Sequence, residues 1–300
     1  MGWKIFSIFF VLIAILLLIL YWFIPFGTIE FGIKSSNSNF SLANSQEGMQ
    51  FYDNMRYPNS RISYKIEDCP LGKEDNMQDA FEIIEDETIL EFYPVSFNEE
   101  ISVTCDDAQK EEGGMFIAGE GGPTEIIKAG NFNVIFHGKI LLIRESKCSK
   151  PNIAIHELLH ALGFEHSSNP SNIMYNFSKC TQTIGEDTIE FLNEIYTIPS
   201  YSDLIFENVS ASMSGRNLEM EMVIRNAGLK DSSGAEVEVY IDNKLDKTID
   251  LDGLKIGHGM KISRTSTVLK LGVSELKLVI VSNFNELDKQ NNEIILEIAE

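Results

Sequence analysis

Three histidines and one glutamate lie within a short stretch of the chain, with a spacing that suits a metal ion. His156 and His160 are four positions apart, so on a helix both side chains project from one face. Gly163 can take the positive φ of a helix C-terminal cap, and the chain can then reverse to bring His166 to the same ion. Zinc held by three protein ligands keeps one position for water, which is the catalytic arrangement. Glu157 lies beside the first histidine and is placed to reach that water.

Two other interpretations of this stretch compete with a three-histidine zinc site. The first is a buried helix whose histidines merely satisfy hydrogen bonds, but three of the five histidines of the chain fall in this one window. The second completes the histidine pair with a distant glutamate, Glu186 or Glu190. The spacing from Gly163 to His166 argues against that second ligand set.

With these residues, the sequence resembles the metzincin metalloproteases, and within them the matrixin-like group. As in matrixins, a serine follows the third histidine, and a tyrosine directly follows the methionine of Asn172-Ile173-Met174-Tyr175. The resemblance implies that Met174 belongs to a Met-turn, the platform beneath the metal. It also implies that the three histidines bind Zn²⁺. Glu157 is then the general base, and afterwards the general acid, in the hydrolysis of protein or peptide substrates.

The matrixin resemblance extends more weakly over residues 57–198. It implies an α+β domain, with a mixed twisted sheet and helices, one of which is the zinc helix. The expected strands are Arg61–Ile66, Phe92–Val95 and Ile101–Thr104, and the expected helices besides the zinc helix are Met77–Glu91 and Asp187–Tyr196.

A glycine-rich segment, Gly113–Pro123, lies ahead of the zinc helix. It lacks the GK[ST] ending and the following helix of a phosphate-binding loop, so that interpretation is rejected. In the matrixin-like interpretation it is the edge strand above the cleft, to which a peptide substrate adds as an extra strand. An ordinary surface loop is the alternative for residues 119–123. The next apolar runs predict two short strands, Phe132–Phe136 and Lys139–Ile143, with His137-Gly138 between them.

The four cysteines all lie in the proposed catalytic domain, and their even number predicts two disulfides in an exported protein. Three pairings are open. Cys148 precedes the zinc helix and Cys180 follows the proposed Met-turn, so we favour Cys148–Cys180 together with Cys69–Cys105. Thiolate ligation of zinc is the alternative, but no pair has CxxC spacing and the histidines already supply a ligand set.

The last third of the chain has a different pattern. Apolar residues alternate with polar ones in short runs separated by turn signals, which predicts an all-β, immunoglobulin-like sandwich over residues 200–300. The runs 223–228, 239–244 and 285–293 resemble the CARDB (cell-adhesion-related) modules of bacterial and archaeal surface proteins. Such a domain is either a spacer or the binding site of a cell-surface ligand. An acidic group at Asp242, Asp246, Asp250 and Asp252 is either a calcium site or a solvated face.

The N-terminal region predicts how the protein is placed in the cell. Residues 5–26 form an apolar run without charge, about long enough to span a bilayer. Lys4 makes the leading flank positive, which favours a cytoplasmic tip (1–4), a transmembrane signal anchor (5–26) and an extracytoplasmic remainder at the cell membrane. A cleaved signal peptide, and hence a secreted protein, is the alternative. Residues 27–56 are expected to form a stalk, flexible over the Ser- and Asn-rich stretch Ser35–Gly48, followed by the catalytic domain (57–199).

The net charge of −21 excludes nucleic acid as a partner, because phosphate contacts need clustered Lys and Arg. The sequence therefore predicts a membrane-anchored, extracytoplasmic zinc endopeptidase. The alternative is a surface adhesion or binding protein whose protease-like domain is catalytically silent; the intact Glu157 argues against it.

Overall fold

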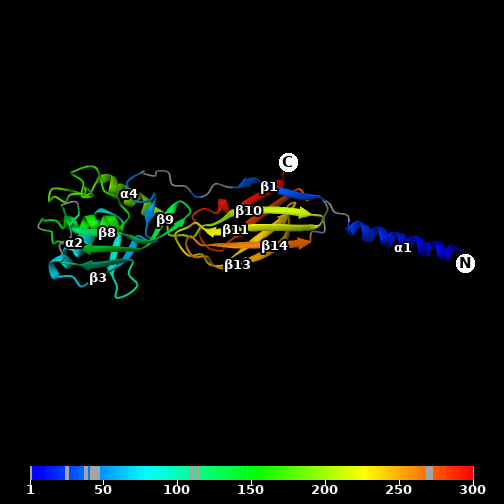
Figure 1. Ribbon diagram of the computed structural model, residues 1–300, viewed down its shortest axis with the longest axis horizontal. Helices are drawn as coiled ribbons and strands as arrows, with labels where there is room; N and C mark the ends of the chain where they lie inside the picture. The colour runs from blue at the N-terminus through cyan, green and yellow to red at the C-terminus, as the bar shows by residue number, and fades with distance from the viewer. Residues whose placement is uncertain are drawn as a thin grey trace.

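The computed structural model describes residues 2–23, 27–36, 40, 48–107, 111–112, 115–146, 148–267 and 273–299. It contains an α/β domain, a β-sandwich domain and an N-terminal helix, in the arrangement of Figure 1. Each domain is organised around its own cluster of buried apolar side chains.

The α/β domain is built on a six-stranded mixed sheet. The strand order is β2-β9-β5-β3-β4, all parallel, and β8 pairs antiparallel with β9 along its outer edge. The strands are β2 (Met55–Arg56), β3 (Arg61–Glu67), β4 (Glu91–Pro94), β5 (Ile101–Cys105), β8 (Gly119–Ala129) and β9 (Phe132–Leu142); a separate small hairpin joins β6 (Glu111–Glu112) to β7 (Met115–Phe116).

Three helices accompany this sheet: α2 (Leu71–Glu87), α3 (Asn152–Ala161) and α4 (Glu186–Thr197). The helix expected over Met77–Glu91 is displaced in the structure. It already begins after Pro70, and it ends where the Thr88 hydroxyl donates to the Ile84 carbonyl at 2.7 Å. The residues that follow are taken up by β4, because their backbone pairs with β3.

The two short strands expected around His137-Gly138 are one continuous strand, β9. Main-chain pairing overrides the turn signal: Gly138 pairs with Ile101 of β5, and His137 pairs with Glu125 of β8. Packing, and not a turn, requires glycine at position 138, because a Cβ there would lie 2.4 Å from the Tyr57 hydroxyl oxygen.

The sandwich domain has eight strands in the order β13-β12-β15-β16-β1-β10-β11-β14. The predicted alternation is present: on β11, Leu218, Met220, Met222 and Ile224 are buried and the residues between them are not. The strands are β1 (Thr28–Ser36), β10 (Leu204–Ser214), β11 (Asn217–Asn226), β12 (Ala235–Ile241), β13 (Lys244–Leu251), β14 (Gly259–Thr267), β15 (Glu275–Val281) and β16 (Glu293–Ile298), with a short 3₁₀ helix at Gln290–Asn292.

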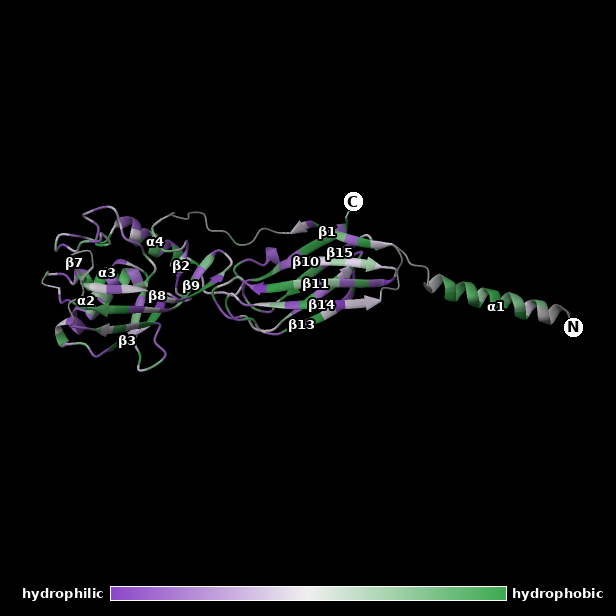
Figure 2. Ribbon diagram, viewed as in Figure 1, coloured by the Kyte–Doolittle hydropathy of each residue, from purple (hydrophilic) through white to green (hydrophobic). Residues whose placement is uncertain are grey.

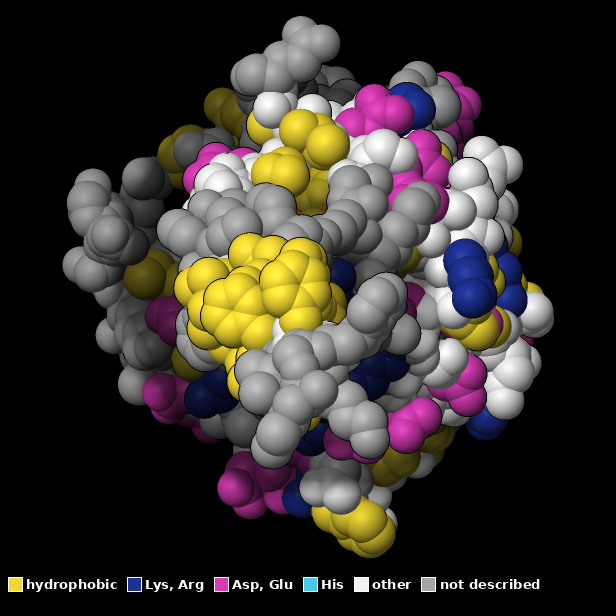
Figure 3. Space-filling model, turned by 90° about the vertical axis from the view of Figure 1, so that its right-hand side faces the viewer, with side chains coloured by type: hydrophobic (Ala, Val, Ile, Leu, Met, Phe, Trp, Pro, Cys, Tyr) yellow, Lys and Arg dark blue, Asp and Glu magenta, His cyan; other side chains and the backbone are white. Residues whose placement is uncertain are grey.

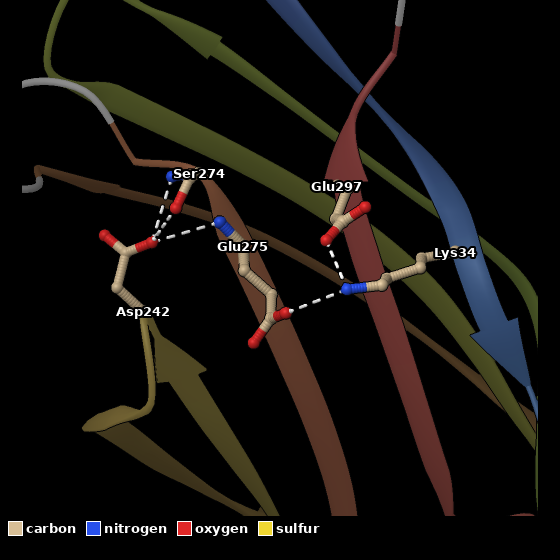
Figure 4. Close-up of polar contacts among 5 residues, drawn as sticks. All are labelled: Lys34, Asp242, Ser274, Glu275 and Glu297. Atoms are coloured by element: carbon tan, nitrogen blue, oxygen red, sulfur yellow. Dashed lines mark hydrogen bonds and ion pairs between the residues drawn. The ribbon is translucent and has the colours of Figure 1, made fainter.

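The expectation of a stalk over residues 27–56 is wrong for Thr28–Ser36, which forms β1 inside the sandwich sheet, and for Met55–Arg56, which forms β2 of the α/β domain. This strand lies between β16 and β10, and Phe31 is buried in the sandwich core. On its outer side Lys34 forms ion pairs with Glu297 and, at 3.6 Å, with Glu275 (Figure 4). Residues 37–39 and 41–47 of the expected stalk lie outside the described part of the chain.

Asp242, one of the acidic residues considered as a calcium ligand, has a structural role. Its Oδ1 accepts hydrogen bonds from the Ser274 main-chain N–H at 3.0 Å, the Ser274 hydroxyl at 2.7 Å and the Glu275 N–H at 3.1 Å (Figure 4). Asp242 thereby ties the β12–β13 turn to the start of β15.

Residues Gly2–Phe23 form helix α1, which projects from the sandwich end of the molecule (Figure 1). Of its described side chains, at residues 6–20, all but that of Ser7 are apolar and nearly all are solvent-exposed. Figure 2 colours most of this helix as hydrophobic, and the end-on view of Figure 3 shows a cluster of hydrophobic side chains facing the viewer. Within the described part of the chain, no helix meets the length and hydropathy needed to cross a membrane.

The two domains share a small apolar contact. Ala129, Phe132 and Val134 of the β8–β9 hairpin pack against Leu229 and Ile256 of the sandwich. The β8–β9 hairpin thus contacts helix α3 at one end and the sandwich domain at the other.

Asp203, just after the domain boundary, predicts a pH-dependent stability. It is 1% exposed, and burial raises the pKa of its carboxyl group to about 6 from 3.8. Because the folded state holds the proton more tightly, the free energy of unfolding should fall as pH rises from about 4 to about 6, by about 3 kcal/mol for two pKa units. We expect Asp203→Asn to raise the melting temperature at pH 7.5 but not at pH 4.

The control for this prediction is Asp246→Asn on the exposed face of β13. Thermal unfolding of both variants at the two pH values checks it. An Asp203→Asn protein whose difference from wild type is the same at both pH values would contradict the assigned role of burial.

Candidate metal centre

Helix α3 carries two of the three histidines and the glutamate, and core packing holds it in place. Ile155, Leu158 and Leu159 are buried in the core of the α/β domain, which fixes the orientation of the opposite face. The helix ends at Ala161 with Leu162 as its C-cap, and the next residue, Gly163, has a φ of 99°. A Cβ there would also lie 2.8 Å from that of Met55, so both conformation and space require glycine.

The structure brings the three predicted histidines together. The Nε2 atom of His160 lies 3.0 Å from that of His156 and 3.2 Å from that of His166. Within the described residues, this is the one group of three His, Cys, Asp or Glu side chains whose ligand atoms all lie within 4.8 Å of one another. Glu186 and Glu190, the alternative third ligands, lie on α4 and are not in this group.

Hydrogen bonds on the other ring nitrogens identify which atoms can bind metal. His156 Nδ1 lies 2.7 Å from the Ile173 carbonyl oxygen, and His160 Nδ1 lies 2.7 Å from that of Phe164. A carbonyl oxygen only accepts, so each Nδ1 must carry the proton. The Nε2 atoms of these two neutral rings then present lone pairs to each other at 3.0 Å, which is unfavourable unless a cation lies between them.

The same distances fit zinc. A tetrahedral ion with Zn–N bonds of about 2.1 Å separates its ligand nitrogens by roughly 3.4 Å. The Nε2 atom of His160 lies close to this distance from those of His156 and His166. Burial lowers the pKa of His160 to about 4 and also lowers the pKa of His156, and the neighbouring histidines contribute in the same direction. Both rings are therefore neutral at pH 7, the form that binds metal.

Glu157 lies one position after the first ligand and is 5% exposed. Burial, followed by repulsion from Glu120, raises the pKa of its carboxyl group to about 8. Strand β8 passes directly over it. A Cβ on Gly119 would lie 2.7 Å from the Glu157 Oε1, and one on Gly121 would lie 2.3 Å from its carbonyl oxygen.

The sequence left open whether residues 119–123 form an edge strand or a surface loop. From residue 119 onwards it is the edge strand β8 and not a surface loop, while residues 113 and 114 lie outside the described part of the chain. Side chains at Gly119 and Gly121 would push the strand away from the zinc helix. Gly119 and Gly121 are two positions apart and so lie on the same face of the strand. This spacing in the sequence is a signal of close approach by another segment.

Met174 is buried at 2% exposure in a turn after the third histidine. The Asn172 carboxamide oxygen accepts from the Met174 N–H at 2.8 Å, and the Met174 carbonyl accepts from the Ser167 N–H at 2.8 Å. The turn is thus bonded to the residue next to His166, and through the Ile173 carbonyl to His156. It orders two of the three histidines.

The α/β domain contains two disulfides, one of which joins the segments on either side of this centre. Cys148 pairs with Cys180, and Cys69 pairs with Cys105, the same pairing as expected from the sequence. The first links the segment before α3 to the segment after the Met174 turn. No thiolate is therefore left to bind zinc.

One contact was missed by the sequence analysis. The Phe51 ring stacks on the His160 ring, with 5.8 Å between centroids. Phe51 lies in the region expected to be a stalk, and no motif or periodicity marks it.

Comparison with known families agrees with the fold and the centre. Residues 56–197 match the model of the matrixin family, and residues 201–295 match that of the CARDB family. The α/β domain with its three-histidine centre is thus of the matrixin class of zinc metalloproteases. The chain as a whole combines a matrixin domain with a C-terminal CARDB domain.

Among solved structures, the chain is similar to a CARDB domain from Pyrococcus furiosus, which was crystallised in complex with di-metal ions. The two are 19% identical with a TM-score of 0.28, and the match covers 33% of this chain and 88% of that chain. The comparison with curated proteins found no match.

Proposed function

We propose that this protein is a zinc endopeptidase that hydrolyses peptide bonds with Glu157 as general base. The convergence of three Nε2 atoms beside a buried carboxyl group is the observation that carries the proposal. The zinc ion held by His156, His160 and His166 would supply a Lewis acid that activates water and polarises the scissile carbonyl.

Glu157 would accept a proton from the attacking water and pass it to the departing amine. The enclosure by β8 supports this role, because the close approach of the strand at Gly119 and Gly121 shields the Glu157 carboxyl group from bulk water. The Met174 turn takes no part in proton transfer. It holds the His156 ring through the Ile173 carbonyl.

A peptide substrate would bind as an additional strand along β8. This strand is at the edge of the sheet, paired on one side with β9, and it passes over Glu157. Main-chain hydrogen bonds to an edge strand accept many sequences, which suits an enzyme acting on protein or peptide segments in extended form.

We also propose that the protein is anchored in the cell membrane through residues 5–26, with both domains outside the cytoplasm. The exposed apolar side chains of α1 support an apolar surrounding for this segment. The pairing of all four cysteines supports an oxidising compartment. Co-sedimentation of the full chain with membranes, resistant to carbonate washing, tests the anchor.

Metal removal tests the proposed activity. The full chain in detergent should cleave an unfolded, fluorescently labelled protein, lose this activity on dialysis against a zinc chelator, and regain it when one equivalent of Zn²⁺ is added. Cleavage that persists at full rate after zinc has been removed would contradict the proposal. Zinc bound at one per chain without any cleavage would favour the adhesion alternative instead.

A further inference from the structure

The residues just before the matrixin match contact the turn that carries the third histidine. Met49–Phe51 lies antiparallel to this turn: Gln50 and Phe164 form a bridge pair. The Phe51 N–H donates to the Gly163 carbonyl at 2.9 Å, and the Glu165 N–H donates to the Met49 carbonyl at 3.0 Å. The turn therefore has a strand-like partner on one side, immediately before His166.

Gln50 holds this segment in place from the other side. It is 8% exposed, and its carboxamide pairs with the Met55 main chain in both directions. Its Nε2 donates to the Met55 carbonyl at 2.8 Å, and its Oε1 accepts from the Met55 N–H at 2.7 Å. The segment is thereby tied to β2 and to the sheet of the α/β domain.

The segment reaches the ligands by two routes. The Phe164 carbonyl, whose residue is bridged to Gln50, accepts the hydrogen bond from His160 Nδ1 at 2.7 Å. The Phe51 ring covers the His160 ring at an interplanar angle of 28°. Hydrogen-bond partners of this kind fix the orientation and tautomer of a metal-binding histidine.

We propose that Met49–Phe51 is a positioning element of the metal centre, although it lies before residue 56, where the matrixin match begins. It holds the His160 ring and the turn leading to His166 in the arrangement that binds zinc. Neither Gln50 nor Phe51 belongs to the group of three histidines that would hold the ion. The inference rests on the proposed function only in taking zinc as the metal.

The test measures zinc affinity of the full chain by competition with a chromogenic chelator, for Gln50→Ala and Phe51→Ala. We expect both to bind zinc about 10- to 100-fold more weakly, as is typical when an outer-shell partner is lost. Phe51→Leu, which keeps an apolar side chain but removes the ring stacked on His160, should lie between Phe51→Ala and wild type.

Tyr52→Ala is the matched control, because Tyr52 is the next residue along the chain and its side chain is 59% exposed. Its zinc affinity should equal that of wild type. Thermal unfolding of the metal-free proteins separates the roles: a purely structural segment would lower the melting temperature of the metal-free variants and leave zinc affinity unchanged.

Wild-type affinity in the Gln50 and Phe51 variants would overturn the inference, as would an equal loss in Tyr52→Ala. If Gln50→Ala or Phe51→Ala does not fold, the Phe51→Leu result decides in the same way. The proposed function fails by a different result: the wild-type protein would bind no zinc, or would bind zinc without cleaving peptides.

Discussion

Replacing Glu157 with glutamine is expected to lower the rate of peptide-bond hydrolysis by about 100- to 10,000-fold, the range contributed by a positioned acid–base group. Glutamine has almost the same shape, so the packing under Gly119 and Gly121 is preserved. It can neither accept the proton of the water nor deliver one to the amine. Zinc content should stay at one per chain, because the three histidines are untouched.

The same substitution has a second effect that does not depend on catalysis. In the metal-free protein the pKa of Glu157 is raised to about 8 from 4.5, so the folded state binds its proton more tightly than the unfolded state. The free energy of unfolding should therefore fall as pH rises from about 4.5 to about 8 in wild type, and Glu157→Gln should lack this component. Thermal unfolding of both metal-free proteins at pH 5 and pH 8.5 measures it.

Glu190→Gln is the control for these measurements, since Glu190 is an exposed glutamate on α4. It should keep wild-type activity and the wild-type dependence of stability on pH. If Glu157→Gln hydrolysed peptides as fast as wild type, the proposed mechanism would be wrong, whatever the effect of the substitution on stability.

Replacing His166 with alanine is expected to weaken zinc binding by more than about 100-fold, the upper limit for loss of an outer-shell partner, because a direct ligand is removed. His166 is exposed, so the substitution opens no cavity in the core. The metal-free variant should therefore unfold at the same temperature as metal-free wild type, and peptide hydrolysis should fall with the zinc content.

Competition with a chelator measures the affinity, and Glu190→Ala provides the comparison. The structure keeps Glu190 out of the histidine group, so its variant should bind zinc as tightly as wild type. If His166→Ala retained zinc and Glu190→Ala lost it, the ligand set would be two histidines and a glutamate, and the matrixin-type centre would be wrong.

The chemistry of this protein could be predicted from the sequence because the groups that carry it are close together in the chain. His156, Glu157 and His160 are placed by the period of a single helix, and Gly163 sets the reversal that follows. The alternating strands of the sandwich were predictable for the same reason, since burial on one face imposes a period of two.

Predictions failed where local signals were ambiguous. His137-Gly138 looks like a turn, but its backbone groups find partners in β5 and β8, so the strand continues through it. The helix expected to start at Met77 starts at Leu71. Its first turn is closed by the Lys73 and Glu74 N–H groups, which donate to the Pro70 carbonyl at 3.0 Å, and the apolar spacing that begins at Met77 does not mark this turn.

The sequence by itself determined the ligand spacing, the base beside it and the division into a matrixin domain and a β-sandwich. The tertiary structure alone decided that Thr28–Ser36 completes the sandwich and that Met49–Phe51 supports the turn before His166. The pairing of Thr28–Ser36 and the bridge from Met49–Phe51 to the turn are made by backbone N–H and C=O groups, which every residue except proline carries in the same form. The Gln50 and Phe51 side chains that complete the second contact belong to no motif or periodic pattern. Pairing of that kind leaves almost no trace in side-chain type or spacing, so only the folded chain shows which segments meet.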